Sequence, residues 1–359
     1  SIHFDEHHWR RGYKTHIFRR IRLTDYLTME AEEAELCFPQ LINTSCKKRV
    51  GSNSETLLIY ILLSCVSLLT VALNLLVIVS ISHFRQLQTP TNLLLLSLAV
   101  SDFLVGLLVM PFHILLAGPC WLLGDLMCAL FFLVAFITLC SSIANMVLIS
   151  VDRYVAICDP LHYFTNVTEN KVRLCVLLSW LYCVFYSFVM LYDILKQPGR
   201  FNSCFGECAI SVNGAVDLVL AFVLPISAII ILYVRVFVVA VSQARSMRSH
   251  VTAVKQQRSM TVTVQRSELK AARTLGIVVA VFLMCYCPYY GVSLSGYELM
   301  MASSTNIFMN FLLLLNSCLN PLIYVFFYPW FRQSIKLIVS FEILQPRSSQ
   351  TNVLSEYLK

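Results

Sequence analysis

Charged and amide side chains interrupt long apolar stretches of this sequence at a few places. Asp102 lies in the segment LSLAVSD, Asp152 and Arg153 are adjacent in VDRY, and a polar run begins at Asn316. A charged side chain at the centre of a bilayer costs about 2.5–3.5 kcal/mol, so such residues normally face the interior of a helix bundle. The chemistry they offer is ion binding and pairing between helices. The sequence shows no converging set of nucleophile, base and oxyanion donors, so we do not expect an enzyme.

Seven apolar segments must position these residues. The chain has 359 residues, of which 58% are hydrophobic and 13% charged, whereas a soluble domain carries roughly 25% charged residues. Each segment has the length of about 20 residues that a helix needs to cross a bilayer. The sequence therefore predicts an all-α membrane fold, a seven-transmembrane helix bundle with a short amphipathic eighth helix at Tyr328–Ser340. The expected spans are Leu57–Ile81, Leu93–Leu116, Leu126–Val151, Leu174–Tyr192, Ala215–Val234, Thr274–Ser295 and Ile307–Tyr328.

Basic residues between the fifth and sixth spans set the expected topology. The formal charge of +7 comes from bases in loops between apolar runs, which indicates membrane orientation and contact with membrane lipid rather than nucleic-acid binding. The positive-inside rule therefore predicts a multi-pass protein of the cell membrane, with the N-terminus outside and the C-terminus inside. The bases between these two spans are Arg245, Arg248, Lys255, Arg258, Arg266, Lys270 and Arg273.

Composition divides the chain into four parts. Residues 1–28 are basic and His-rich, and Met29 opens an acidic stretch, so we expect 1–28 to be a non-native upstream segment. Residues 29–56 are expected to form an extracellular tail, in which the sequon at Asn43 should carry a glycan. The seven-helix domain covers residues 57–328, and a cytoplasmic helix and tail cover 329–359.

A series of motifs, with one set in each span, resembles the rhodopsin-like family of G-protein-coupled receptors. The segment NSCLNPLIYVFFYPWF, which starts at Asn316, looks like the fingerprint of the trace amine-associated receptors, and the resemblance covers nearly the whole chain from Met29. Such a receptor binds a small protonated amine in the extracellular half of the bundle and activates a heterotrimeric G protein, raising cyclic AMP. Most members of the family are olfactory receptors, and fish carry many diverged copies, so the resemblance implies an odorant receptor of an olfactory sensory neuron. The motifs are Asn74, Asp102, Asp152-Arg153-Tyr154, Trp180, Pro225, Pro288 and the run Asn316–Tyr324.

The resemblance also implies an ion site and a switch inside the bundle. Asp102 and oxygens from neighbouring helices match the family's internal sodium site, which favours the resting state; the alternative is a hydrogen-bonded polar patch without an ion. Apart from this allosteric sodium ion, the resemblance implies no cofactor. Arg153 can be held by Asp152 at rest and released to meet a G protein. The sodium site comprises Asp102, Ser142, Asn316, Ser317 and Asn320, and the switch comprises Asp152, Arg153, Tyr154, Asn320, Pro321 and Tyr324.

Two disulfides follow from the same resemblance. Cys128 is expected to bond Cys208, as in most rhodopsin-like receptors. Cys204 is expected to bond the N-terminal tail, with Cys46 preferred over Cys37 as its partner. The expected outer side of the membrane is oxidising, so such bonds are chemically permitted there.

The expected amine site departs from the family pattern at its central acid. Amine receptors carry an Asp on the third span, 18 residues before the Arg of the DRY motif, and Ala135 stands at that position here. Phe136 and Leu139 continue an apolar face. Asp217 lies eight residues before Pro225, about two helical turns toward the outside, and we expect it to replace the missing acid, as in diverged fish members of the family. The alternative is a structural Asp at the water-exposed mouth of the helix.

Aromatic side chains on the sixth span complete the expected site. Tyr286, Tyr289, Tyr290 and Ser293 are spaced i, i+3, i+4 and i+7, which places them on one helix face. Beside a buried acid, tyrosine faces attract an alkylammonium by about 0.5–2 kcal/mol each; otherwise such a stripe is core packing. Asn310 is expected to line the remaining wall.

Two other functions are compatible with a membrane bundle. A transporter or channel would need internal repeats or a polar face running through the membrane, and the sequence shows neither. A rhodopsin-like receptor for a non-amine small molecule on the same scaffold stays open as the alternative. A response to neutral or acidic odorants, with silence to every amine, would favour it.

Overall fold

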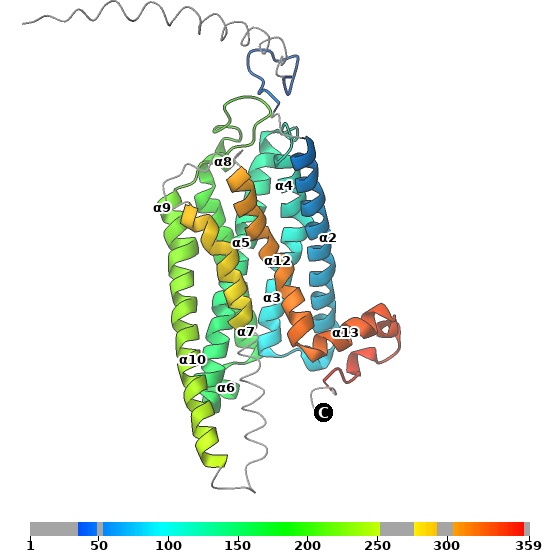
Figure 1. The fold of residues 1–359 in the computed structure, drawn as a ribbon, viewed down its shortest axis with the longest axis vertical. Coiled ribbons are helices and arrows are strands. Elements are labelled where there is room, and N and C mark those ends of the chain that lie inside the picture. Colours follow the sequence, from blue (N-terminus) through cyan, green and yellow to red (C-terminus); the bar gives the residue numbers. More distant parts are fainter. Residues whose placement is uncertain (1–34, 49–52, 252–275, 293–303, 355–359) are drawn as a thin grey trace, which may run out of the picture.

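Long helices lying side by side make up this protein (Figure 1). The computed structural model describes residues 35–48, 53–251, 276–292 and 304–354. In this part of the chain, six helices are long and apolar enough to cross a membrane, and Gly276–Val292 forms a shorter apolar helix. The predicted seven-helix membrane bundle is therefore confirmed, while residues 1–28 lie outside the described residues. The six spans are Leu57–His83, Pro90–Leu116, Gly124–Cys158, Glu169–Met190, Gly214–Ser242 and Phe308–Phe327.

Several of these spans are built from more than one helical element. The second span joins α3, a π-helix and α4, and the fifth joins α9, a π-helix and α10. The short α6 and α8 follow the third and fourth spans. The elements are α2 (Asn53–His83), η1 (Arg85–Leu87), α3 (Pro90–Leu104), η2 (Val105–Val109), α4 (Met110–Leu116), α5 (Gly124–Cys158), α6 (Pro160–Asn166), α7 (Glu169–Met190), α8 (Tyr192–Lys196), α9 (Gly214–Asp217), η3 (Leu218–Val223), α10 (Leu224–Val251), α12 (Ser304–Phe327), α13 (Pro329–Val339), η4 (Glu342–Leu344) and η5 (Ser348–Gln350).

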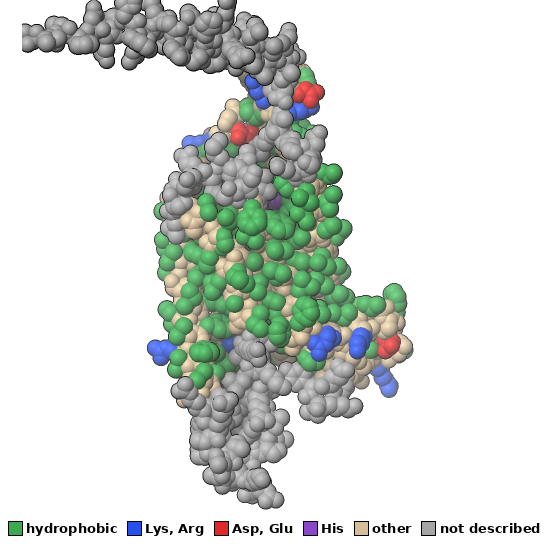
Figure 2. Space-filling model, viewed as in Figure 1, with side chains coloured by type: hydrophobic (Ala, Val, Ile, Leu, Met, Phe, Trp, Pro, Cys, Tyr) green, Lys and Arg blue, Asp and Glu red, His purple; other side chains and the backbone are tan. Residues whose placement is uncertain are grey.

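The bundle is apolar outside and polar at several points inside. Figure 2 shows hydrophobic side chains covering its mid-section, with charged side chains gathered at the two ends. Phe185 and Leu68 are about 70% exposed on this surface, at 69% and 72%. Asn74, Asp102 and Asn316, by contrast, are completely buried. This distribution suits lipid as the solvent, because a buried polar group can find partners only inside the protein.

Local sequence explains where the helices begin and bend. Thr89 caps α3 by accepting a hydrogen bond from the Asn92 backbone amide at 3.3 Å, and Pro90 occupies the first turn, where its missing N–H costs nothing. Pro321 lies inside α12 and deletes a backbone hydrogen bond there. The π-helix η3 ends at Val223, just before Pro225. Wide turns of this kind occur often at functional sites.

The third span, α5, lies at the centre of the bundle. It packs against α3, α7 and α10. The first and seventh spans are joined on the other side, because the Asn74 amide donates to the Ser317 carbonyl at 3.0 Å. The central position of α5 places its side chains within reach of several other helices.

The amphipathic helix predicted at Tyr328–Ser340 is present as α13, which projects to the side of the bundle (Figure 1). Trp330, Phe331 and Ser334 are buried against the bundle, while Arg332 and Lys336 are exposed. We call this end of the bundle the α13 end. The opposite end carries three disulfides, and we call it the disulfide end.

Candidate functional site

A cavity of about 230 Å³ opens between the helices toward the disulfide end. The third span contributes one wall, and the short helix Gly276–Val292 contributes another. Eight of the nine residues predicted to bind a ligand line this cavity, and the ninth, Ser293, lies outside the described residues. The eight are Ala135, Phe136, Leu139, Asp217, Tyr286, Tyr289, Tyr290 and Asn310; the remaining lining residues are His113, Leu116, Phe132, Cys140, Ile143, Tyr186, Ile210, Val212, Ala221 and Leu313.

Asp217 supplies the only carboxylate among the described residues that line this cavity. Its helix starts at Asn213, whose side chain accepts a hydrogen bond from the Val216 backbone amide at 3.2 Å. The Tyr186 hydroxyl donates to Asp217 Oδ1 at 2.7 Å, and the Tyr290 side chain lies close to the same carboxyl group. Asp217 therefore points into the bundle, between tyrosines from two neighbouring helices.

The π-helix η3 separates Asp217 from Pro225. If the segment from Asp217 to Pro225 were a regular α-helix, its eight residues would make about two turns. Both side chains would then lie near the same helix face. An extra residue in a wide turn rotates what precedes it by about 100°, the angle of one residue in an α-helix. The cavity-facing direction of Asp217 is thus set by this π-helix as well as by its distance from Pro225.

Aromatic rings surround the acid on the side of the helix Gly276–Val292. Phe222 and Tyr290 stack with their ring centroids 4.4 Å apart, and Tyr289 meets Tyr290 edge-on at 5.2 Å. Deeper in the bundle, Tyr286 packs on Phe282 at 4.3 Å. These contacts fix the ring orientations, so the tyrosine faces near Asp217 are preorganised for a cation.

The wall formed by the third span is apolar where amine receptors carry an acid. Ala135 lines the cavity with only 5% of its surface exposed. Phe132 and Leu139 extend this wall on the same helix. On the seventh span, Leu314 is buried in a hydrophobic cluster and does not line the cavity. No acid of the third span therefore lines the cavity beside Asp217.

A second polar group of side chains lies deeper, around Asp102. The Asn320 amide donates to Asp102 Oδ2 at 2.8 Å, and the Ser142 hydroxyl donates to Asp102 Oδ1 at 3.3 Å. The Ser317 side chain lies close to the same Asp102 carboxyl group. Neither side-chain atom of Asn316 has a hydrogen-bond partner, and Asn320 Oδ1 has none either. Carboxylate, hydroxyl and amide oxygens suit a hard cation, so the five predicted residues fit a sodium ion, which would supply a positive charge beside Asp102.

At the α13 end, Arg153 is held in a buried hydrogen-bond network. Its Nη2 atom lies 2.6 Å from Asp152 Oδ2 and donates to Thr91 Oγ1 at 2.6 Å. The Tyr163 hydroxyl donates to Asp152 Oδ1 at 2.9 Å. Burial and the neighbouring Asp152 carboxylate raise the pKa of Tyr163 to about 12, so this hydroxyl stays protonated and able to donate. Both Asp152 and Arg153 are only 4% exposed.

The other predicted switch residues lie on the third span, which carries Tyr154, and on the seventh span, which carries Asn320, Pro321 and Tyr324. Tyr324 is 1% exposed, and its hydroxyl has no hydrogen-bond partner. The Tyr233 hydroxyl on α10 is likewise buried without a partner. Tyr154 packs beside Ile157 and Val236, where the end of α5 meets the middle of α10. The residues that would move together are therefore close-packed but incompletely hydrogen-bonded.

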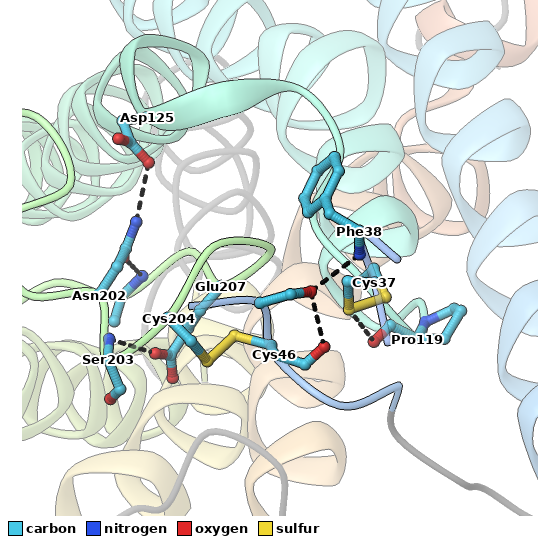
Figure 3. The surroundings of a disulfide bond; sticks show 12 residues. Cys37, Phe38, Cys46, Pro119, Asp125, Asn202, Ser203, Cys204 and Glu207 are labelled. Atoms are coloured by element: carbon cyan, nitrogen blue, oxygen red, sulfur yellow. Dashed lines mark hydrogen bonds between the residues drawn. A yellow bond between two sulfur atoms is a disulfide. The ribbon is translucent and has the colours of Figure 1, made fainter. Parts of the chain in front are cut away.

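Three disulfides tie the N-terminal tail and two loops together at the disulfide end. Cys128 is bonded to Cys208 and Cys46 to Cys204, the two pairs that the resemblance implied. Figure 3 shows the Cys46–Cys204 bond beside Cys37. Backbone pairing reinforces this bond, because Cys46 N–H donates to the Phe205 carbonyl at 2.9 Å. Asn43, in the predicted sequon, is exposed.

Cys37 was predicted only as the less favoured partner of Cys204, and this alternative is wrong. Cys37 is bonded to Cys120 in the loop before the third span. Cys120 stands on the same side of the bundle as the other five paired cysteines, and an even number of cysteines there was the available signal. The remaining eight cysteines are free.

The bundle and its polar interior match a known family along most of the chain. The family described as 7 transmembrane receptor (rhodopsin family) matches residues 73–324. Trace amine-associated receptor 13c of Danio rerio is 37% identical over 344 residues, 92% of this chain and 99% of that receptor. Trace amine-associated receptor 7e of Mus musculus is 39% identical over 340 residues, 91% of this chain and 94% of that receptor.

The chain belongs to the trace amine-associated receptor family.

Membership defines the kind of protein and its general partners. This is a rhodopsin-like G-protein-coupled receptor in the membrane, with a ligand and a heterotrimeric G protein as partners, and it is not an enzyme. Trace amine-associated receptor 7a of Rattus norvegicus is similar to the same extent, at 38% identity over 339 residues. The resemblance stated from the motifs is thereby confirmed.

Two polar residues of the cavity, Tyr186 and His113, were not among the residues predicted to bind the ligand. Tyr186 lies on α7 and His113 on α4, and both line the cavity. Each is a polar side chain in an apolar run, the same signal that identified Asp217. All nine predicted ligand-binding residues lie on the third, fifth, sixth and seventh spans, whereas these two residues lie on the fourth and second spans.

Proposed function

We propose that this receptor binds a small protonated amine through Asp217 in the cavity near the disulfide end. The observation that carries the proposal is the position of Asp217 as the only carboxylate among the described lining residues, held by Tyr186. A buried carboxylate without a basic neighbour needs a positive partner to offset its desolvation. A ligand ammonium supplies that charge.

The cavity offers further groups for such a cation. A carboxylate has about four lone-pair sites, so Asp217 can accept hydrogen bonds from Tyr186, from Tyr290 and from an ammonium together. The ring faces of Tyr289 and Tyr290 lie beside it and attract an alkylammonium by about 0.5–2 kcal/mol each. The ligand is recognised from the fifth and sixth spans, with the apolar wall at Ala135 receiving its hydrocarbon part.

Ligand binding is proposed to reach the G protein through the same helices. Asp217 lies on the span that continues into α10, and Tyr233 of α10 lies within electrostatic range of Arg153. Tyr233 also faces Gly276, at the start of the neighbouring helix. Drawing the fifth and sixth spans together at the disulfide end would repack this contact and release Arg153 toward a stimulatory G protein that raises cyclic AMP.

A sodium ion at Asp102 is proposed to favour the resting state. The unpartnered Asn316 side chain and Asn320 Oδ1 support this proposal, since a buried polar atom without a partner is destabilising. A cation there satisfies oxygens from the second, third and seventh spans at once and so opposes their relative movement.

The disulfide end is proposed to face outside and the α13 end inside. Three disulfides require an oxidising compartment, and the exposed Arg332 and Lys336 lie at the opposite end, as the positive-inside rule expects. With this orientation the cavity receives external amines, and the family resemblance supports odorant detection in olfactory sensory neurons.

Replacing Asp217 tests the proposed amine site. Cells expressing the receptor would be challenged with a panel of amines and of neutral and acidic odorants, with cyclic AMP as the readout. We expect Asp217→Asn to lower amine potency about 10- to 100-fold, because a hydrogen bond to a charged group contributes about 1.5–3 kcal/mol.

Asp193→Asn is the matched control. This acid is 62% exposed on α8 and lies 3.6 Å from Arg200, so its replacement should leave amine potency unchanged. Amine responses that survive Asp217→Asn at full potency would contradict the proposal. A wild-type receptor that responds only to neutral or acidic odorants would favour the non-amine alternative instead.

A further inference from the structure

The amine cavity has a second polar wall, on the side of the bundle opposite Asp217. Asp217 ends α9, whereas His113 lies on α4, and Figure 1 shows these two helices on opposite sides of the bundle. Both residues line the same cavity. A ligand whose ammonium is bound at Asp217 therefore presents its other end to His113.

The His113 ring is fixed in place but leaves its nitrogen atoms available. It meets the Phe131 ring edge-on, with centroids 5.2 Å apart. Among the residues that the structure describes, none forms a hydrogen bond with the His113 imidazole ring. An imidazole is both a hydrogen-bond donor and an acceptor when neutral, and this half-buried ring lines the cavity. A group that enters the cavity can therefore form a hydrogen bond with it.

The third span lets the two polar walls share one space. Ala135 stands between them on the central helix α5, where amine receptors carry an Asp, and its small side chain fills little of the cavity. Phe132 and Phe136 form the rest of this middle section. The third span thus gives the cavity an apolar wall, while Asp217 and His113 offer polar groups from the fifth and second spans.

The charges on the lining residues restrict the far end of the ligand. The described part of the lining contains one carboxylate, that of Asp217, and no Lys or Arg. A second ammonium would have no second acid beside it, and a ligand carboxylate would have no basic side chain other than His113. Burying either charge without a partner is costly. A neutral hydroxyl avoids this cost and matches the imidazole, because it can donate to one ring nitrogen or accept from the other.

We propose that His113 binds a neutral hydroxyl group at the end of the ligand opposite the ammonium, so that the receptor selects hydroxylated monoamines. The inference rests on amine binding at Asp217 and adds the second recognition group. The cavity of about 230 Å³ is smaller than the 300–1,000 Å³ typical for drug-sized ligands, which suits a small amine bearing one hydroxyl group. A site that hydrogen-bonds a hydroxyl discriminates against the analogue that lacks it.

Pairs of amines that differ by one hydroxyl group test this proposal. Suitable pairs are 2-phenylethylamine with tyramine, tryptamine with 5-hydroxytryptamine, and hexylamine with 6-aminohexanol; cadaverine serves as a diamine probe. The cyclic AMP response of cells would be measured for each compound, with surface expression of every variant measured alongside. For at least one pair, we expect the wild-type receptor to prefer the hydroxylated member about 10-fold, the effect of one well-placed hydrogen bond. Cadaverine should be weaker than that hydroxylated member.

His113→Phe should abolish the preference by lowering the potency of the hydroxylated member to that of its partner. His113→Gln, which keeps a donor and an acceptor, should retain part of the preference. Leu116→Phe is the matched control, because this α4 residue also lines the cavity but offers no hydrogen bond, so it should affect both members of a pair alike.

The outcomes separate this proposal from amine binding itself. Asp217→Asn should weaken both members of each pair. If it does so while His113→Phe leaves the preference intact, or while the wild-type receptor shows no preference in any pair, the role of His113 is refuted and the amine site stands. A preference for cadaverine also refutes it. If Asp217→Asn has no effect, or no amine is active, both proposals fail.

Discussion

At the scale of single residues, the polar interior around Asp102 is incompletely satisfied by protein atoms. Both side-chain atoms of Asn316, both of Asn145 and the Ser141 hydroxyl are buried without a hydrogen-bond partner. Leaving a polar group in this state costs about 1–3 kcal/mol. The unpartnered Asn316 side chain and Asn320 Oδ1 support the proposal that a small cation binds at Asp102.

Sodium should therefore lower the affinity of the receptor for an activating amine, and Asp102→Asn should remove this effect. The variant loses the charge that attracts the ion but keeps the shape of the side chain. Amine potency would be measured while sodium is exchanged for a large organic cation at constant ionic strength. We expect a shift of about fivefold or more in the wild type, the lower range of allosteric coupling, and none in the variant. Equal sodium dependence in both proteins would exclude an ion at Asp102.

Most of the cavity could be predicted from single residues, because polar side chains in apolar runs are costly and helical spacing gives their faces. Asp217, Tyr289 and Tyr290 were found in this way. Tyr186 and His113 carry the same local signal but were not predicted as ligand-binding residues, since their distances to Asp217 depend on how the fourth and second spans pack. Spacing within one helix does not reveal which helix lies next to it.

At the scale of elements, the end of α5 is held by two neighbours. Thr91 at the start of α3 and Tyr163 in α6 both hydrogen-bond Asp152, at 3.0 and 2.9 Å. Asp152 in turn holds Arg153. The resting position of Arg153 thus depends on two elements besides its own helix.

Tyr163→Phe should raise the basal activity of the receptor. The variant removes one hydrogen bond to Asp152 and so weakens the hold on Arg153; a loss of about 1 kcal/mol changes the balance of resting and active states about fivefold. Cyclic AMP would be measured without ligand and corrected for surface expression. His162→Gln is the control, because this neighbouring side chain is 67% exposed and faces Asp159. Unchanged basal activity in Tyr163→Phe would argue against a restraining role for α6.

The helices themselves were predicted well, since apolar length is a strong signal for a membrane span. The third span continues to Cys158, beyond the predicted end at Val151, because the DRY segment remains helical after the apolar run stops. The π-helices η2 and η3 had no signal in the sequence pattern used. They alter the register inside a span, which hydropathy averaged over about 20 residues does not detect.

At the scale of the whole molecule, two disulfides join the tail to the loop before the third span and to the loop before the fifth span, and a third joins the latter loop to the third span. The Cys37–Cys120 bond has a sequence separation of 83 residues and the Cys46–Cys204 bond one of 158. The tail also pairs its backbone with the loop before the fifth span, since Phe205 N–H donates to the Thr44 carbonyl at 2.8 Å. The roof of the cavity is therefore assembled from parts of the chain that are distant in sequence.

Cys120→Ser should reduce the thermal stability and surface expression of the receptor. A bond that closes a loop of this length stabilises a protein by about 4–5 kcal/mol in the chain-entropy description. Thermal unfolding of the purified receptor would be compared among Cys120→Ser, Cys37→Ser and the double variant. Because both cysteines serve one bond, the double variant should be no less stable than either single variant. Additive losses would show that Cys37 and Cys120 act separately.

The interleaved order of the bridges has a consequence for synthesis of the chain. Cys37 meets its partner after 83 residues, but Cys46 must wait for 158, which at about 5–20 residues per second is roughly 8–30 s. Cys128 can form its bond at almost the same time as Cys46, because its partner Cys208 is synthesised only four positions after Cys204. Two of the three bridges can thus close only after the fourth span has been made. A nascent chain that stalls before Cys204 exposes two reactive thiols, which oxidoreductases and quality control in the secretory pathway can recognise.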